Sequence, residues 1–224
     1  MSLKGFFQNS YFYLFLGCMG ALGSLGITIL MAEKASSEPV LAPYPGIVPS
    51  ACPEQTQAQL NLCAYEWEQA TDQHREEVYN NLLATLNPEQ TIDLEQVELS
   101  WRIFESNYCR LLSDSYRGGT IQPLILSTCR AERDNERIEI LLQWGAVDAE
   151  YEALAIELQN TYQTVLQEGS PYQQERLPLN QAFWELYQTR QCDWEAMQAE
   201  ISDQQRKQCL TRLSQQRLEQ LRLF

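Results

Sequence analysis

Cysteines are the residues of this 224-residue chain whose type and spacing most clearly indicate chemistry. Six of the seven follow the first apolar segment: Cys52, Cys63, Cys109, Cys129, Cys192 and Cys209. An even number of cysteines in an exported region is typical of disulfide bonds. No CxxC pair occurs, so neither a redox dithiol nor a zinc site is indicated. The cysteines therefore predict structural disulfides, with no metal and no cofactor.

Catalytic constellations are missing from the rest of the sequence. His74 is the single histidine, which leaves little room for a Ser-His-Asp triad or a His-rich metal site. The carboxylates are numerous, but no two share the apolar setting that acid–base catalysis requires. We therefore predict a protein that is not an enzyme and has no catalytic residues.

The charge balance narrows the class of partner. The chain has 30 Asp and Glu residues against 16 Lys and Arg, which gives a formal net charge of −14. Such an acidic chain repels phosphate backbones, so nucleic-acid binding is excluded. With 44% hydrophobic and 21% charged residues, the composition is that of a globular protein.

An apolar segment at the start of the chain indicates the compartment. Residues 11–32 carry no charge, and a helix of that length spans the core of a bilayer. Lys4 precedes them, which favours a cytoplasmic N-terminus. We predict that residues 1–32 are an uncleaved signal-anchor, so that the soluble part is exported and tethered to the inner membrane. The alternatives are a cleaved signal peptide, which would give a secreted protein, and a lipoprotein signal at Cys18.

The remainder of the chain contains a duplication. Residues 33–51 carry four prolines and read as a semi-extended linker. After them, six positions recur in matching order, the first three at an offset of 83 residues and the others at 80: Tyr79/Tyr162, Trp101/Trp184, Cys109/Cys192, Cys129/Cys209, Arg137/Arg217 and Leu141/Leu221. The repeat predicts a first domain over residues 52–144 and a second, degenerate copy over residues 145–224.

The duplication suggests a disulfide connectivity that spacing alone leaves open. Equivalent positions favour equivalent bridges, Cys109–Cys129 in the first copy and Cys192–Cys209 in the second. Cys52–Cys63 then remains as a local pair. Each bridge would staple a small helical unit whose own core is thin.

Helical signals dominate the exported part. Five apolar residues are spaced by four, three, four and three, which is one stripe of an α-helix: Val97, Trp101, Phe104, Tyr108 and Leu111. Pro88 and Pro171 suit the first turns of helices. We predict an all-α fold, in which the membrane helix is followed by two tandem disulfide-stapled helical hairpins. The expected core includes Trp101, Phe104, Trp184 and Tyr187, whereas Arg133 and Arg137 are expected on a solvated face.

Three segments of the first copy resemble the lysozyme-inhibitor LprI N-terminal-domain family. CPEQTQAQLNLC (52–63) is similar to its Cys-Gln/Asn-rich-Cys opening, and QVELSWRIFESNYC (96–109) to its helix with Trp and Cys. GGTI (118–121), followed by Cys129, is similar to the rest. The resemblance covers about residues 52–142, and residues 148–222 look like a degenerate second copy. It implies a small, exported, disulfide-bonded helical domain in bacteria, without catalytic residues.

The polar loop over residues 113–120 is the candidate site for a partner, because a bridge from Cys109 to Cys129 would pin it and reduce the entropy lost on binding. Its candidate contact residues are Asp114, Ser115, Tyr116, Arg117, Gly118 and Gly119.

Two functions follow as hypotheses. The first is a protein-interaction domain of the bacterial envelope that inhibits a lysozyme-type muramidase. Such enzymes are commonly basic, and an acidic partner would associate with them faster. The alternative is a structural or assembly factor that binds another membrane or envelope protein.

Overall fold

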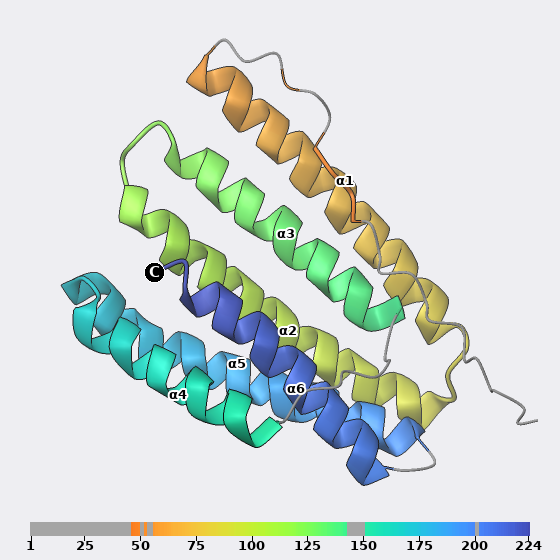
Figure 1. Ribbon diagram of the computed structural model, residues 1–224. Helices are drawn as coiled ribbons and strands as arrows, with labels where there is room; N and C mark the ends of the chain where they lie inside the picture. Colours follow the sequence, from red (N-terminus) through yellow and green to blue (C-terminus); the bar gives the residue numbers. More distant parts are fainter. Residues whose placement is uncertain (1–45, 50–51, 53–55, 143–150, 200–201) are drawn as a thin grey trace, which may run out of the picture. The chain divides into compact units, whose positions relative to one another are not determined.

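The computed structural model describes residues 46–49, 52, 56–142, 151–199 and 202–224 (Figure 1). Residues Leu41–Phe224 form one compact unit. The predicted membrane segment 11–32 and most of the predicted linker lie outside the described residues. In the part that is described, no helix is both long and apolar enough to cross a bilayer.

Helices account for the regular structure of the described residues, which contain no strand. They are α1 (Gln57–Leu83), α2 (Pro88–Ser113), the short 3-10 helix η1 (Asp114–Tyr116), α3 (Gln122–Leu142), α4 (Tyr151–Glu168), α5 (Pro171–Gln198) and α6 (Ser202–Leu221). The prediction of an all-α fold is confirmed for these residues.

The second helix of each repeat, α2 and α5, begins with the same capping arrangement. The Asn87 side chain accepts hydrogen bonds from the first turn of α2, and the Gln90 side chain accepts one from the Asn87 backbone. Ser170 and Gln173 form the same reciprocal capping box at the start of α5. In both helices a proline follows the cap, where its missing N–H has no cost. The caps lie 83 residues apart, in register with the sequence repeat.

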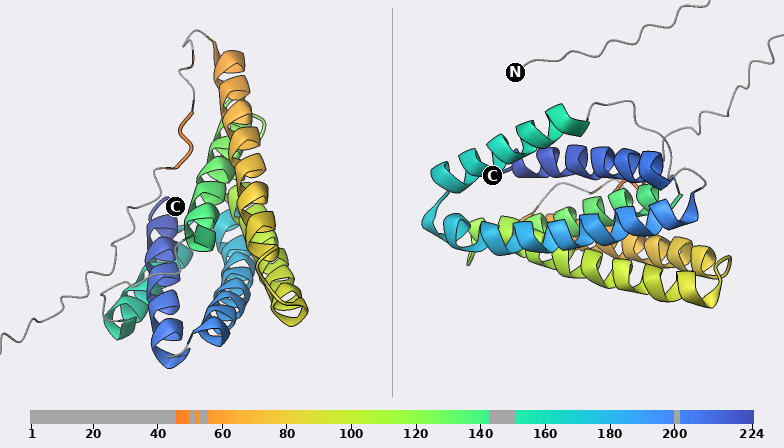
Figure 2. Two further views of the ribbon diagram at one scale, coloured as in Figure 1. Left: turned by 90° about the vertical axis from the view of Figure 1, so that its right-hand side faces the viewer. Right: turned by 90° about the horizontal axis from the view of Figure 1, so that it is seen from below.

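The third helix of each repeat lies between the other two. α3 packs against α1 and α2, and α6 packs against α4 and α5. The two repeats meet where α2 packs against α5, as the views from two directions show (Figure 2). Each repeat is therefore a three-helix unit in which the first helix is covered by the third helix instead of by its neighbour in sequence.

One hydrophobic core runs through both repeats. All five residues of the predicted stripe on α2 are buried, and so are Trp184 and Tyr187 on α5. The rings of Phe104 and Tyr187 stack across the α2–α5 contact, with centroids 6.1 Å apart. The core thus crosses the boundary predicted between residues 144 and 145.

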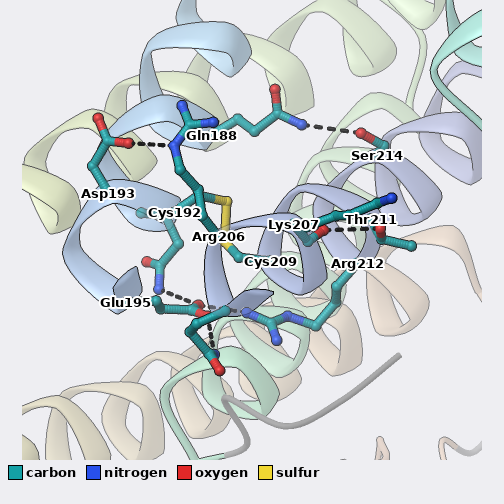
Figure 3. The surroundings of a disulfide bond; sticks show 12 residues. Gln188, Cys192, Asp193, Glu195, Arg206, Lys207, Cys209, Thr211, Arg212 and Ser214 are labelled. Atoms are coloured by element: carbon teal, nitrogen blue, oxygen red, sulfur yellow. Dashed lines mark hydrogen bonds and ion pairs between the residues drawn. A yellow bond between two sulfur atoms is a disulfide. The ribbon is translucent and has the colours of Figure 1, made fainter. Parts of the chain in front are cut away.

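Among the described residues there are three disulfides, and they are the pairs expected from the repeat: Cys52–Cys63, Cys109–Cys129 and Cys192–Cys209. Cys109–Cys129 ties α2 to α3, and Cys192–Cys209 ties α5 to α6. Figure 3 shows the Cys192–Cys209 bridge. Two ion pairs lie near it, Arg206 with Asp193 and Arg212 with Glu195.

The end of the predicted linker is held against α1 and α3. The Asn135 side chain on α3 accepts a hydrogen bond from the Ile47 N–H (2.8 Å) and donates one to the Ile47 carbonyl (2.9 Å). The Trp67 indole on α1 donates to the same carbonyl (2.6 Å). Gly46 has a φ of +68°, a conformation that glycine adopts without strain, and it lies against Asn135. We call this arrangement the linker clasp.

Asn135→Ala is expected to release the linker clasp without unfolding the helices, because it removes both hydrogen bonds to Ile47, each of which contributes about 1 kcal/mol. The amide of Ile47 should exchange with solvent faster by at least tenfold, as measured by hydrogen exchange. Asn80→Ala, an exposed asparagine on α1, is the control and should leave this amide unchanged. An Ile47 amide that exchanges equally in both variants would contradict the clasp.

Candidate partner-binding site

The loop singled out from the sequence joins α2 to α3. It begins with η1, and Gly118 then takes a φ of +79°, which lets the chain turn back into α3. The Cys109–Cys129 disulfide links the two helices that carry the loop. From α1, the Asn61 side chain donates a hydrogen bond to the carbonyl of Thr120 (2.9 Å). All three helices of the first repeat therefore hold this loop.

Asp114 fastens the loop and is not a free carboxylate. It pairs with Arg117 (2.6 Å) and accepts hydrogen bonds from the Gln122 amide (3.2 Å) and from the Tyr172 hydroxyl on α5. Its side chain is only 8% exposed. Although burial alone would raise it, the pKa of Asp114 lies below its usual value because Arg117 and Tyr172 donate hydrogen bonds to the carboxylate.

The other candidate residues of the loop face solvent. Tyr116 is 46% exposed, the Arg117 side chain is 67% exposed, and Ser115, Gly118 and Gly119 are exposed as well. The Arg117 guanidinium also lies over the Tyr172 ring, 5.4 Å from its centroid. A partner would thus meet Tyr116 and the outer edge of Arg117, with Asp114 behind them.

A network of buried charges lies beneath the surface of the first repeat, where α1, α2 and α3 meet. Arg75 is fully buried and pairs with Glu98 (2.7 Å), Asp134 (2.9 Å) and Asp72 (2.5 Å). The other oxygen of Glu98 pairs with Arg137 (3.0 Å), which is also fully buried. Glu98 therefore bridges two guanidinium groups, each removed from solvent.

The arginines of α3 correct the sequence-based expectation. Arg133 is 6% exposed and Arg137 is not exposed at all, so the predicted solvated face is wrong. Arg137 lies over the rings of Trp101 and Tyr187, both 5.7 Å away, and its charge is matched by Glu98 from α2. Spacing along one helix identifies neighbours on that helix, but these partners come from other helices.

The same network opens to solvent in a pocket of about 280 Å³ between the three helices. Its lining includes Glu105, whose carboxylate lies 3.7 Å from the Arg130 guanidinium. Burial raises the pKa of Glu105 to about 7, although Arg130 favours the ionised form. Burial likewise raises the pKa of Asp134 and of Glu136 to about 7, against the attraction of Arg75 and Arg133 respectively. The described residues contain no group of three or more metal-ligating side chains placed to hold an ion.

Glu105→Gln is expected to stabilise the protein above neutral pH. The folded-state pKa of Glu105, about 7, lies above that of an unfolded glutamate, so its contribution to stability is lost as the pH rises through 7. Glutamine cannot ionise, and the variant should exceed the parent by roughly 1–3 kcal/mol at pH 8 and match it near pH 5. Urea unfolding at both pH values measures this difference. Glu132→Gln, on an exposed side chain, serves as control, and a Glu105→Gln effect that is the same at both pH values would be inconsistent with the shift.

The comparisons with known proteins give one match. Residues 50–141 match the family described as "Lysozyme inhibitor LprI", which confirms the resemblance found over residues 52–142. The matched residues include α1, α2, η1 and nearly all of α3, and therefore the loop and the buried network. No curated protein and no solved structure matches the chain.

Proposed function

We propose, from the premise that residues 50–141 are a domain of the LprI lysozyme-inhibitor family, that this chain is an exported, non-catalytic interaction protein of the bacterial envelope that inhibits lysozyme-type muramidases. The observation that carries the proposal is the family match itself. Three disulfides agree with an oxidising compartment. The net charge of −14 would speed association with a basic enzyme.

We place the contact surface at the exposed part of the α2–α3 loop. The residues there are Ser115, Tyr116, Arg117, Gly118 and Gly119. Tyrosine and arginine are the side chains that most often dominate binding energy at interfaces. The Cys109–Cys129 bridge and the Asp114 contacts hold the loop in place before binding, so less entropy is lost in the complex.

Membrane attachment is part of the proposal. Residues 11–32 would anchor the chain in the inner membrane, and the linker up to the clasp at Ile47 would separate the anchor from the helical unit. Inhibition would then take place at the outer surface of that membrane.

The test is to titrate lysozyme with oxidised protein comprising Leu41–Phe224. The rate of bacterial-cell lysis is measured at each concentration, at low and at physiological salt. We expect dose-dependent inhibition at micromolar or lower concentration, weakened by salt. Tyr116→Ala should raise the concentration needed by about tenfold. Tyr65→Ala is the matched control, because Tyr65 is similarly exposed (52%) on α1. Absence of inhibition against several lysozyme types would refute the proposal.

The second candidate function is a structural or assembly factor for another envelope protein. Apolar side chains exposed on the outer sides of α2 and α5 favour it: Leu99, Ile103, Leu179 and Leu186. Such a factor would co-purify with a membrane protein when the full chain is isolated in detergent. It would not inhibit any lysozyme.

A further inference from the structure

A groove on the seam between the two repeats has a composition unlike that of the rest of the chain. It has a volume of about 340 Å³ and is lined by Arg102, Ile103, Ser106, Asn107 and Arg110 of α2 and by Phe183 of α5. None of these six residues is acidic, although the chain has 30 carboxylates against 16 basic side chains. The groove is thus lined by two basic side chains and no acidic one on a protein that is acidic overall.

The two arginines of the groove keep donors available. Among the described residues, the Arg110 guanidinium forms no hydrogen bond and no ion pair, and the residue is exposed. Arg102 donates one long hydrogen bond to Glu76 (3.4 Å) and lies 3.5 Å from Glu98, and its side chain is 47% exposed, so part of its guanidinium faces solvent. Guanidinium groups pair with carboxylates and phosphates through two parallel hydrogen bonds.

A buried relay fixes which end of the Asn107 amide faces the groove. Arg217 is fully buried and can only donate, and it donates to the Asn180 side-chain oxygen (2.8 Å). The Asn180 amide nitrogen must then donate, and it does so to the Asn107 side-chain oxygen (3.2 Å). The NH₂ group of Asn107 is therefore the end left for the groove. An arginine of the second repeat thus sets the polarity of a donor on the first.

The remaining lining residues add an apolar wall and a hydroxyl. Ile103 is 40% exposed, and Phe183 packs partly against the core. Ser106 lies one turn from both Arg102 and Arg110 on the same face of α2. The lining therefore combines hydrogen-bond donors with apolar carbon, which suits a ligand that carries both kinds of group.

We propose that this groove binds an anion joined to an aliphatic chain, a carboxylate or phosphate held by Arg102, Arg110 and the Asn107 amide, with its chain against Ile103 and Phe183. The proposal does not depend on muramidase binding, because the groove and the α2–α3 loop use different residues.

Isothermal titration of oxidised Leu41–Phe224 with octanoate, octyl phosphate and octylammonium tests the groove. We expect saturable 1:1 binding of at least one anion and none of the cation, and the comparison of the two anions identifies the preferred head group. Asn107→Asp keeps the oxygen that accepts from Asn180 but replaces the outward donor with a carboxylate oxygen, so it should weaken binding at least tenfold. Arg110→Gln should do the same.

Asn160→Asp is the matched control, since it makes the same change at an exposed position of α4 and should leave the affinity unchanged. Circular dichroism establishes that each variant is folded. The proposal is overturned if neither anion binds at millimolar concentration, if octylammonium binds as well as the anions, or if Asn107→Asp and Asn160→Asp have the same effect.

Discussion

Replacing Glu98 with glutamine is expected to destabilise the protein by roughly 3 kcal/mol, which is a large part of the stability of a domain. Glutamine has nearly the same shape, so the change removes charge without opening a cavity. Arg137 would lose its ionic partner while fully buried, and Arg75 would lose one of its carboxylates. Removing one member of a buried ion pair is costly because the other charge stays out of water.

Urea unfolding of the oxidised protein at pH 7 measures the effect. Glu95→Gln removes the same charge one turn earlier on α2, where the side chain is exposed, and should change the stability by less than about 0.5 kcal/mol. Equal stability of the two variants would mean that Glu98 does not hold the two arginines together.

The second repeat lacks the carboxylates of this network. At the equivalent places, leucine (Leu158) stands for Arg75, Gln181 for Glu98 and Ser214 for Asp134, and Arg217 alone keeps its charge. Arg217 bonds to Asn180 and Gln181 and lies over three rings, those of Phe104, Tyr108 and Trp184. Burial lowers the pKa of Arg217 to about 10. The second copy thus retains one arginine of the network and replaces its ionic partners with neutral groups.

Local patterns predicted the elements of this fold well. The apolar stripe on α2 is buried, and the proline-led starts of α2 and α5 are where the sequence placed them. The interleaving of α3 between α1 and α2 was not predictable in this way, because helical periodicity identifies an apolar face without naming the helix that covers it. The burial of Arg137 was not predictable for the same reason, since the carboxylate that pairs with it, Glu98, lies 39 residues away in the sequence.

The glycines and flanking cysteines located the candidate loop. They did not predict which of its side chains are available to a partner. Asp114 looked available for a partner, yet Tyr172 on α5, 58 residues away, donates a hydrogen bond to it. Only the contact between repeats brings these two side chains together. The groove beside Asn107 went unrecognised for the same reason, because its polarity depends on Arg217 in the other repeat.

The three disulfides are expected to differ in how much stability the protein loses when each is removed. Removing the pair Cys109–Cys129 with two alanine substitutions should cost roughly 2–5 kcal/mol, because the bridge closes a loop and both half-cystines are buried in the core. Cys192–Cys209 is buried to the same degree and should behave alike. Cys52 and Cys63 are only partly buried, and the double alanine variant there should retain most of the stability. Thermal unfolding of the three variants measures the order, and a Cys52/Cys63 variant as unstable as the others would contradict it.

The exposure of the three disulfides also predicts the order in which they are reduced. That order determines how a loss of lysozyme inhibition in reduced protein would be interpreted. A limiting amount of thiol should open Cys52–Cys63 first, since a thiolate can reach it without unfolding the helices. Alkylation and mass spectrometry would then find Cys52 and Cys63 modified while the other four cysteines remain paired. If this partly reduced protein still inhibits lysozyme but the fully reduced protein does not, the loss comes from release of the α2–α3 loop and the core. If inhibition is already lost, the segment near Cys52 belongs to the contact surface, and the α2–α3 loop does not act alone.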